Sequence, residues 1–371
     1  MKSTASLAVL LFSVSACSGD LPGDGFGAGG QSGSSGGAAS GGATSSGGSF
    51  SSGGSGSGGT LSGSSGGADG AGGTVGDGAG GSDGSGGSYA SGGGDGSGGS
   101  DGSGGDAGEE TQSAGCGKSR TLMNGRRSIQ SGGMNREYIL RVPDDYDNNH
   151  PYRLVMAYHW LNGNANQVAE GGNGGSTDDP YYGLWDLAEG STIFVAPEGL
   201  NAGWANSGGA DVNFTDAMLE AIQADLCIDT TRIFATGFSY GGGMSYALAC
   251  ARADVFRGVA IYAGAQLSGC TGGTTPIAYF HAHGSNDTVL NISQGRSLRD
   301  KFVGVNGCTP QNPPEPGTNS GTHTCTSYQG CTEGYPLRWC AHGGGHNPTE
   351  KDQGQNKSWV PGEAWTFISQ F

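Results

Sequence analysis

The chain has 371 residues, of which 79 are glycine, and a formal net charge of −16. Glycine at this level is far above ordinary usage, and more than half of it lies between Ser18 and Gly115, a segment without lysine or arginine. From Cys116 onward the chain is only mildly acidic. This composition argues against binding of nucleic acid, which needs a basic surface to meet the phosphates.

Residues 1–17, MKSTASLAVLLFSVSAC, are typical of an export signal, because one lysine precedes a short apolar run and small residues precede Cys17. The apolar run is too short for a membrane-spanning helix. The stretch VSAC resembles a bacterial lipobox, in which the cysteine is acylated. We therefore expect a chain that is secreted or anchored to the bacterial cell envelope through Cys17. The acyl chains on Cys17 would be its only contact with a membrane. An ordinary secretory signal cut near Ala16 is the alternative.

Residues 18–115 consist mainly of Gly, Ser, Ala, Asp and Thr. Such a segment cannot bury enough apolar surface to offset the entropy lost on ordering. We predict a disordered linker with a typical reach of about 55 Å, as expected for a flexible chain of this length.

Residues 116–371 suffice for one large α/β domain. Eight of the nine cysteines lie in this part, and an even number in an exported domain predicts up to four disulfides, whose pairing the sequence leaves open. A zinc site would need paired Cys-x-x-Cys spacings, which the sequence lacks, so no metal or cofactor is expected. Nothing in the sequence indicates an oligomer, and we expect a monomer.

Strand-like and helix-like segments alternate along this part. Short runs that are apolar on both faces predict buried parallel strands; they span residues 137–143, 152–160, 192–198, 232–239, 258–264, 277–284 and 336–342. Apolar residues at steps of three and four predict helices over 211–226, 239–253 and 293–306. The alternation predicts an open, mainly parallel sheet covered by helices, with reactive groups at the carboxyl ends of its strands.

The pentapeptide GFSYG at residues 237–241 follows the apolar run RIFAT directly and leads into a helix-compatible segment. Strand, tight turn and helix are the setting of a nucleophile elbow, in which a serine is held in a strained turn. The glycines at 237 and 241 allow strand and helix to approach closely. We therefore predict that Ser239 is a catalytic nucleophile; the alternative is a simple helix N-cap.

A serine nucleophile needs a histidine base and an orienting carboxylate. In α/β-hydrolases the chain order is serine, acid, histidine. Asp287 follows an apolar run and is the predicted acid, in preference to Asp300 and Asp352. The predicted base is His346 in GGGHNP, with His342 as the alternative.

An oxyanion must be held by backbone amides. Position in the sequence suggests the amide of Tyr240 together with that of Trp160 or Leu161, in the turn HWLNG after an early strand. Trp160, Trp204 and Trp359 are candidates for stacking on an aromatic substrate. The alternative for each tryptophan is a place in the core.

Ten segments, among them YHWLNG, IFATGFSYGGGMSYALAC, HGSNDTVL and RWCAHGGGH, resemble the secreted feruloyl (cinnamoyl) esterases of carbohydrate esterase family 1, whose relatives include acetylxylan esterases and polyhydroxybutyrate depolymerase-like proteins. The resemblance implies an α/β-hydrolase that releases hydroxycinnamic acids from plant polysaccharides such as feruloylated arabinoxylan, with Ser239, Asp287 and His346 as its triad. The family's HG oxyanion turn reads HWLNG here, so the second amide cannot be carried over.

Acetylxylan esterase and polyhydroxybutyrate depolymerase activity are the alternatives that keep the same triad. A carbohydrate-binding surface lipoprotein that has kept the fold and lost activity is the alternative outside the enzymes.

Overall fold

The computed structural model describes residues 111–171 and 179–371. The predicted signal, Cys17 and the predicted linker up to Glu110 lie outside the described residues, and only the last residues before Cys116 are seen. Within the described ranges, no helix combines the length and the apolar character that crossing a membrane requires.

Nine strands form one sheet in the order β1-β2-β4-β3-β5-β6-β7-β9-β8. The central strands β4, β3, β5, β6, β7 and β9 are parallel to one another, while β1, β2 and β8 pair antiparallel at the two sides. The strands are β1 (Gly125–Ser131), β2 (Met134–Arg141), β3 (Tyr152–Tyr158), β4 (Thr192–Pro197), β5 (Ile228–Phe238), β6 (Gly258–Tyr262), β7 (Ala278–Gly284), β8 (His323–Ser327) and β9 (Leu337–His342).

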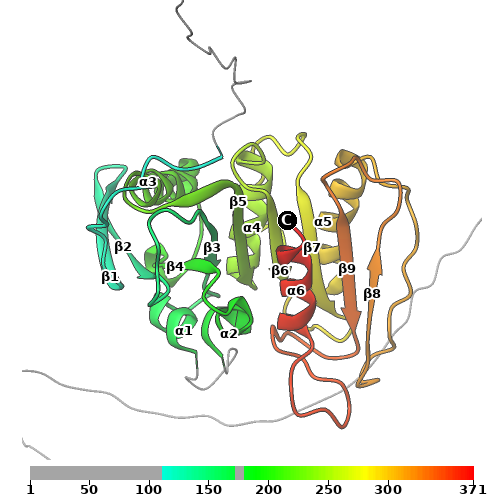
Figure 1. Ribbon diagram of the computed structural model, residues 1–371. Coiled ribbons are helices and arrows are strands. Elements are labelled where there is room, and N and C mark those ends of the chain that lie inside the picture. Colours follow the sequence, from blue (N-terminus) through cyan, green and yellow to red (C-terminus); the bar gives the residue numbers. More distant parts are fainter. Residues whose placement is uncertain (1–110, 172–178) are drawn as a thin grey trace, which may run out of the picture. The chain divides into compact units, whose positions relative to one another are not determined.

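Helices cover both faces of this sheet (Figure 1). The α-helices are α1 (Ala165–Glu170), α2 (Leu184–Ala188), α3 (Ala210–Asp225), α4 (Tyr240–Ala251), α5 (Ile292–Val305) and α6 (Val360–Ser369), and three short 3₁₀ turns are η1 (Pro180–Gly183), η2 (Leu200–Ala202) and η3 (Ser207–Gly209). Successive residues of a strand point to opposite faces. In β3, Met156 accordingly packs in the core under α3, α4 and α5, and Val155 in the core under α1, α2 and α6.

The seven predicted strands and three predicted helices are present, with bounds that shift by a few residues. Six of the strands are parallel as predicted, whereas β2, predicted at 137–143, is antiparallel to both β1 and β4 and only partly buried. Two edge strands were not predicted. In β1, exposure alternates along the polar sequence GRRSIQS, and β8 is half-buried, so neither shows the continuous apolar run of a central strand. His323 begins β8.

The predicted disulfides are confirmed, and all eight cysteines of this part are paired. The bonds are Cys116–Cys227, Cys250–Cys270, Cys308–Cys331 and Cys325–Cys340. The last of these joins the edge strand β8 to β9.

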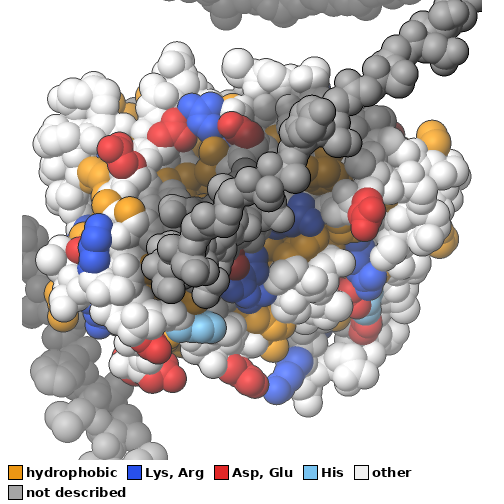
Figure 2. Space-filling model, turned by 45° about the horizontal axis from the view of Figure 1, so that its top comes forward, with side chains coloured by type: hydrophobic (Ala, Val, Ile, Leu, Met, Phe, Trp, Pro, Cys, Tyr) orange, Lys and Arg blue, Asp and Glu red, His pale blue; other side chains and the backbone are white. Residues whose placement is uncertain are grey.

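The surface carries charges of both signs. On the face in Figure 2, outside the grey atoms, Lys and Arg side chains are interspersed with Asp and Glu, and hydrophobic side chains lie in the hollows between them. This distribution fits the mildly acidic composition of the domain.

Candidate active site

Ser239 lies in a sharp turn between β5 and α4. Its backbone has φ 56° and ψ −115°, a conformation that costs a non-glycine residue free energy and is found at functional sites. The amide of Ser239 donates to the carbonyl of Tyr262 in the neighbouring strand, at 2.9 Å, and its own carbonyl accepts from Gly243 in the first turn of α4, at 3.0 Å. The strained turn is therefore held by hydrogen bonds on both sides.

Two glycines make this turn possible. A Cβ on Gly237 would lie 2.4 Å from the carbonyl carbon of Gly241, and a Cβ on Gly241 would lie 2.0 Å from the carbonyl oxygen of Tyr158. Strand β5, helix α4 and the end of β3 thus meet with their backbones in contact. This geometry is the strand–turn–helix arrangement of a nucleophile elbow.

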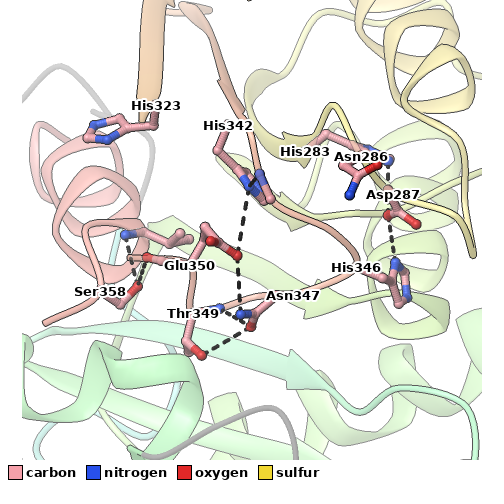
Figure 3. A network of polar contacts seen from close by, with 12 residues as sticks. His283, Asn286, Asp287, His323, His342, His346, Asn347, Thr349, Glu350 and Ser358 are labelled. Carbon is pink, nitrogen blue, oxygen red and sulfur yellow. Dashed lines mark hydrogen bonds and ion pairs between the residues drawn. The ribbon is translucent and has the colours of Figure 1, made fainter. Parts of the chain in front are cut away.

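Asp287 and His346 lie in contact with each other, although 59 residues separate them in the sequence. The Nδ1 of His346 is 2.7 Å from Oδ2 of Asp287, and the two side chains are 14 % and 0 % exposed (Figure 3). The Asp287 loop follows β7 and the His346 loop follows the adjacent β9. These loops are joined by hydrogen bonds from Ser285 N–H to His342 O, at 2.7 Å, and from Asn286 N–H to Gly344 O, at 3.0 Å.

Asp287 is held as a carboxylate. Burial alone would raise its pKa, but hydrogen bonds from His283, His346 and the backbone amide of Leu290 outweigh burial and lower the pKa below its ordinary value. Its other oxygen, Oδ1, accepts from the amides of Val289 and Leu290, both at 2.8 Å. An ionised carboxylate in this position can orient a neighbouring imidazole and stabilise its protonated form.

His346 also reaches the serine turn. Its ring lies 4.6 Å, centroid to centroid, from that of Phe238, the residue before Ser239. The three residues that the sequence singled out therefore belong to one region at the carboxyl ends of β5, β7 and β9.

The alternative acid and base residues have other partners. Asp300 is exposed and pairs with Arg299 at 2.8 Å, and Asp352 bonds to His323 at 2.8 Å. His342 accepts a hydrogen bond from the Gly344 amide at 3.2 Å. Burial, followed by the nearby His283, lowers the pKa of His342 to about 4.

The turn after β3 offers the amides that the sequence suggested. The amides of Asn162 and Gly163 donate to Ala202 O at 2.8 Å and to Trp160 O at 2.9 Å. Within the described part of the chain, no acceptor engages the amides of Trp160, Leu161 or Tyr240. Because the end of β3 packs against the first turn of α4, these amides come from two neighbouring turns and have no acceptor within the described residues.

His159 locks this turn in place. Its ring is fully buried, and its Nδ1 lies 2.7 Å from the carbonyl oxygen of Trp160, so Nδ1 carries the proton. Its Nε2 then accepts from the amide of Gly199 at 2.9 Å. Acceptance at Nε2 requires a neutral ring, and burial lowers the pKa of His159.

The three tryptophans lie in different settings. Trp204 is fully buried and donates from its indole to the carbonyl of His159 at 2.7 Å, so it offers no surface to a substrate and instead holds the turn after β3. Trp160 is half-buried, with its ring 6.3 Å from that of Phe238. Trp359 stacks on His323 with ring centroids 4.0 Å apart and meets the ring of His342 edge-on at 5.8 Å, so its ring contacts are with β8 and the end of β9.

Apolar side chains are exposed around the serine turn. Leu161 is 53 % exposed and Val289, which follows the acid, is 64 % exposed. A Cβ on Gly203 would lie 2.9 Å from the ring of Tyr240 and 3.5 Å from Leu161, so both side chains lie close to Gly203. An ester with an apolar acyl group would meet such a surface.

Only one group among the described residues has metal-ligand spacing, and it comprises His323, Cys325 and Glu363. Cys325 is bonded to Cys340, so it has no thiolate to offer a metal.

The strand order, the elbow and the acid–histidine pair define an α/β-hydrolase. A model of the prolyl oligopeptidase family matches residues 200–290. The chain is 48% identical over 264 residues to feruloyl esterase D of Neurospora crassa, covering 70% of this chain and 90% of that protein. It is 47% identical over 256 residues to feruloyl esterase C of Emericella nidulans, covering 69% and 90%.

Among solved structures, a CE1 ferulic acid esterase from Anaeromyces mucronatus in complex with ferulic acid matches with a TM-score of 0.45 and 16% identity, covering 66% of this chain and 89% of that one. From the sequence relatives, the chain belongs to the feruloyl esterase family. It is a carboxylic ester hydrolase.

Two groups of residues in this region were missed by the reasoning from sequence. His281 and His283 precede the acid in the chain, yet both lie on β7 behind it, with His283 Nε2 3.4 Å from Asp287. Their spacing of two in a strand, which puts both on one face of the sheet, was the signal that could have found them. The role of His159 has no comparable signal, because it depends on a partner 40 residues away.

Proposed function

We propose that the protein hydrolyses feruloyl and related hydroxycinnamoyl esters of plant cell-wall polysaccharides, with Ser239 as nucleophile. The observation that carries this proposal is the contact between Asp287 and His346 beside the strained serine turn, in a chain whose relatives are feruloyl esterases. The half-buried Trp160 and the exposed Leu161 supply an apolar surface for the acyl group.

The reaction begins when Ser239 Oγ attacks the ester carbonyl carbon and His346 takes the hydroxyl proton. Asp287 stabilises the resulting imidazolium, and the amide of Tyr240, with that of Trp160 or Leu161, donates to the oxyanion. The sugar alkoxide leaves with the proton from His346. Water, deprotonated by His346, then attacks the acyl-enzyme and releases the hydroxycinnamate and free Ser239.

The test is hydrolysis of methyl ferulate, acetylated xylan and short-chain polyhydroxybutyrate by the purified protein, side by side with Ser239→Ala. We expect methyl ferulate to be the best substrate and Ser239→Ala to lower kcat by at least about 10³-fold with an unchanged melting temperature. Preference for acetylated xylan or the polyester would assign the alternative esterase activities. Substantial turnover by Ser239→Ala would refute the nucleophile.

We further propose export of the chain, because four disulfides form in oxidising compartments, and its display on the cell envelope through an acylated Cys17. Incorporation of labelled palmitate that Cys17→Ala abolishes is the expected result. A labelled Cys17→Ala variant, or an unlabelled wild type, would contradict the anchor.

A further inference from the structure

A chain of buried hydrogen-bonding side chains runs along one face of β7 and ends beside Asp287. The Tyr279 hydroxyl lies 3.0 Å from Nδ1 of His281, and Nε2 of His281 lies 3.2 Å from Nδ1 of His283. The Nε2 of His283 lies 2.8 Å from the carbonyl oxygen of Leu290 and 3.4 Å from Oδ2 of Asp287. Both histidines are fully buried, and the mechanism above uses neither.

The direction of these hydrogen bonds is fixed at one end. A carbonyl oxygen only accepts, so Nε2 of His283 carries a proton and points it at Leu290 O and Asp287. Nδ1 of His283 is then an acceptor for the Nε2 proton of His281. Nδ1 of His281 in turn accepts from the Tyr279 hydroxyl. Burial, with His283 and Arg299 adding to it, keeps the pKa of His281 well below its ordinary value.

We propose that His283 is a positioning residue for the acid of the triad. It ties the carbonyl of Leu290 to β7 and presents an N–H to Oδ2, the oxygen that also bonds to Nδ1 of His346. The proposal rests on the proposed roles of Asp287 and His346. Figure 3 shows Asp287 between the two histidines, bonded on one side to His346 and on the other to His283.

Helix α5 is shaped around this ring. A Cβ on Gly295 would lie 2.3 Å from Nδ1 of His283 and 3.0 Å from its Cε1, so only glycine at this position leaves the ring where it is. The ring cannot move aside easily, because both nitrogens are bonded and its side chain has no exposed surface. A glycine here also costs helix stability relative to alanine.

The titratable and charged groups around His283, Asp287 and the histidine behind them come from several elements. They are Tyr279 and His281 on β7, Arg299 on α5, which acts on His281, His342 at the end of β9, and His346 in the loop beyond it. Of these, only His346 is placed to exchange a proton with a substrate. A substitution of His283 should therefore change the pH dependence of the reaction by changing the ionisation of His346.

The test compares His283→Gln, whose amide nitrogen can replace Nε2, with His283→Asn, whose shorter side chain leaves that position empty. Activity is measured on methyl ferulate and p-nitrophenyl acetate from pH 4 to 9, together with thermal melting. We expect His283→Asn to lower kcat about tenfold or more, with KM changed less than threefold. The acidic limb of kcat/KM should move up by about half a pH unit, because a carboxylate with one donor fewer holds the His346 proton more strongly. His283→Gln should restore kcat to within about threefold of wild type.

Gly295→Ala gives a second reading that leaves the histidine in place. We expect it to lower kcat about tenfold despite the gain in helix propensity, while Gly304→Ala, on the same helix with nothing within 4 Å, leaves kcat unchanged. This pair also decides the question if His283→Asn does not fold.

Two results would overturn the proposal. The first is a folded His283→Asn variant with wild-type kcat and an unchanged acidic limb of the kcat/KM profile. If that variant does not fold, the equivalent result is wild-type kcat in Gly295→Ala. The other is a fall in kcat that His283→Gln does not repair or that leaves the limb unmoved, which would assign His283 to folding alone. Loss of activity in Ser239→Ala with full activity in the His283 variants would sink this inference and leave the proposed function intact, whereas an active Ser239→Ala would sink the proposed function.

Discussion

Gly241 lies where the turn that holds Ser239 contacts the turn that follows β3. A single methyl group on Gly241 should push these two turns apart. The Cβ of alanine would lie 2.0 Å from the carbonyl oxygen of Tyr158 and 2.7 Å from that of His159, well inside the roughly 3.5 Å of ordinary van der Waals contact. Overpacking of this kind costs about 1–3 kcal/mol. Alanine gains about 1 kcal/mol over glycine in a helix, so we expect a net loss of about 1 kcal/mol, about 2–4 °C in melting temperature for a domain of this size.

The catalytic effect should exceed the effect on stability. Relief of the overlap must move the start of α4 away from the end of β3, and a displacement of about 1 Å between reacting groups can lower kcat about 100-fold. Gly362→Ala is the matched control, because Gly362 also lies in the first turn of a helix, α6, with nothing within 4 Å. It should melt slightly higher and keep full activity on methyl ferulate. Wild-type kcat and melting temperature in Gly241→Ala would refute the close approach of the two turns.

Two further predictions concern buried aromatic side chains near the site. Trp204→Phe removes the donor to the carbonyl of His159 and should lower kcat about tenfold with little change in KM, since the oxyanion turn acts in the transition state; a raised KM with unchanged kcat would instead place Trp204 in substrate binding. His342 has a folded-state pKa of about 4, below the roughly 6.5 of an unfolded chain, so its contribution to stability is complete above pH 6.5 and is lost as the pH falls toward 4. Between pH 6.5 and pH 4, the free energy of unfolding measured in urea should therefore fall by about 2–3 kcal/mol less in His342→Asn than in wild type. An equal fall in both proteins would show that His342 does not titrate in this pH range.

The central strands could be predicted from sequence because burial on both faces leaves continuous apolar runs. Strand β1 could not be predicted, because it lies at the edge of the sheet and pairs only with β2. Every second residue of β1 is exposed, so its sequence looks like that of a polar loop. Helices α1 and α2 are too short for a periodic pattern to develop, and their identity depends on packing against the sheet.

The acid and the base of the site follow from chain order, because each loop after a parallel strand ends at the same edge of the sheet. That rule could place Asp287 and His346 near one another. It could not show that Trp204 is buried behind the oxyanion turn, since a tryptophan in a loop gives no sign of which way its ring turns. Nor could it show that His283 supports the acid, because this depends on the tautomer that Leu290 imposes.

The point at which the chain enters the domain has a practical consequence. Residues Thr111 to Ser113 bond to the first residues of β5, through Thr230 N–H to Thr111 O at 2.7 Å and Ser113 N–H to Ile228 O at 2.9 Å. Ser239 follows the last residue of the same 11-residue strand, which rises about 3.3 Å per residue. A bead, a fusion partner or a cell surface coupled ahead of Thr111 is therefore attached near the start of β5, at the end of this strand opposite Ser239. Immobilisation through the N-terminal side should therefore leave the candidate active site accessible to a solid substrate.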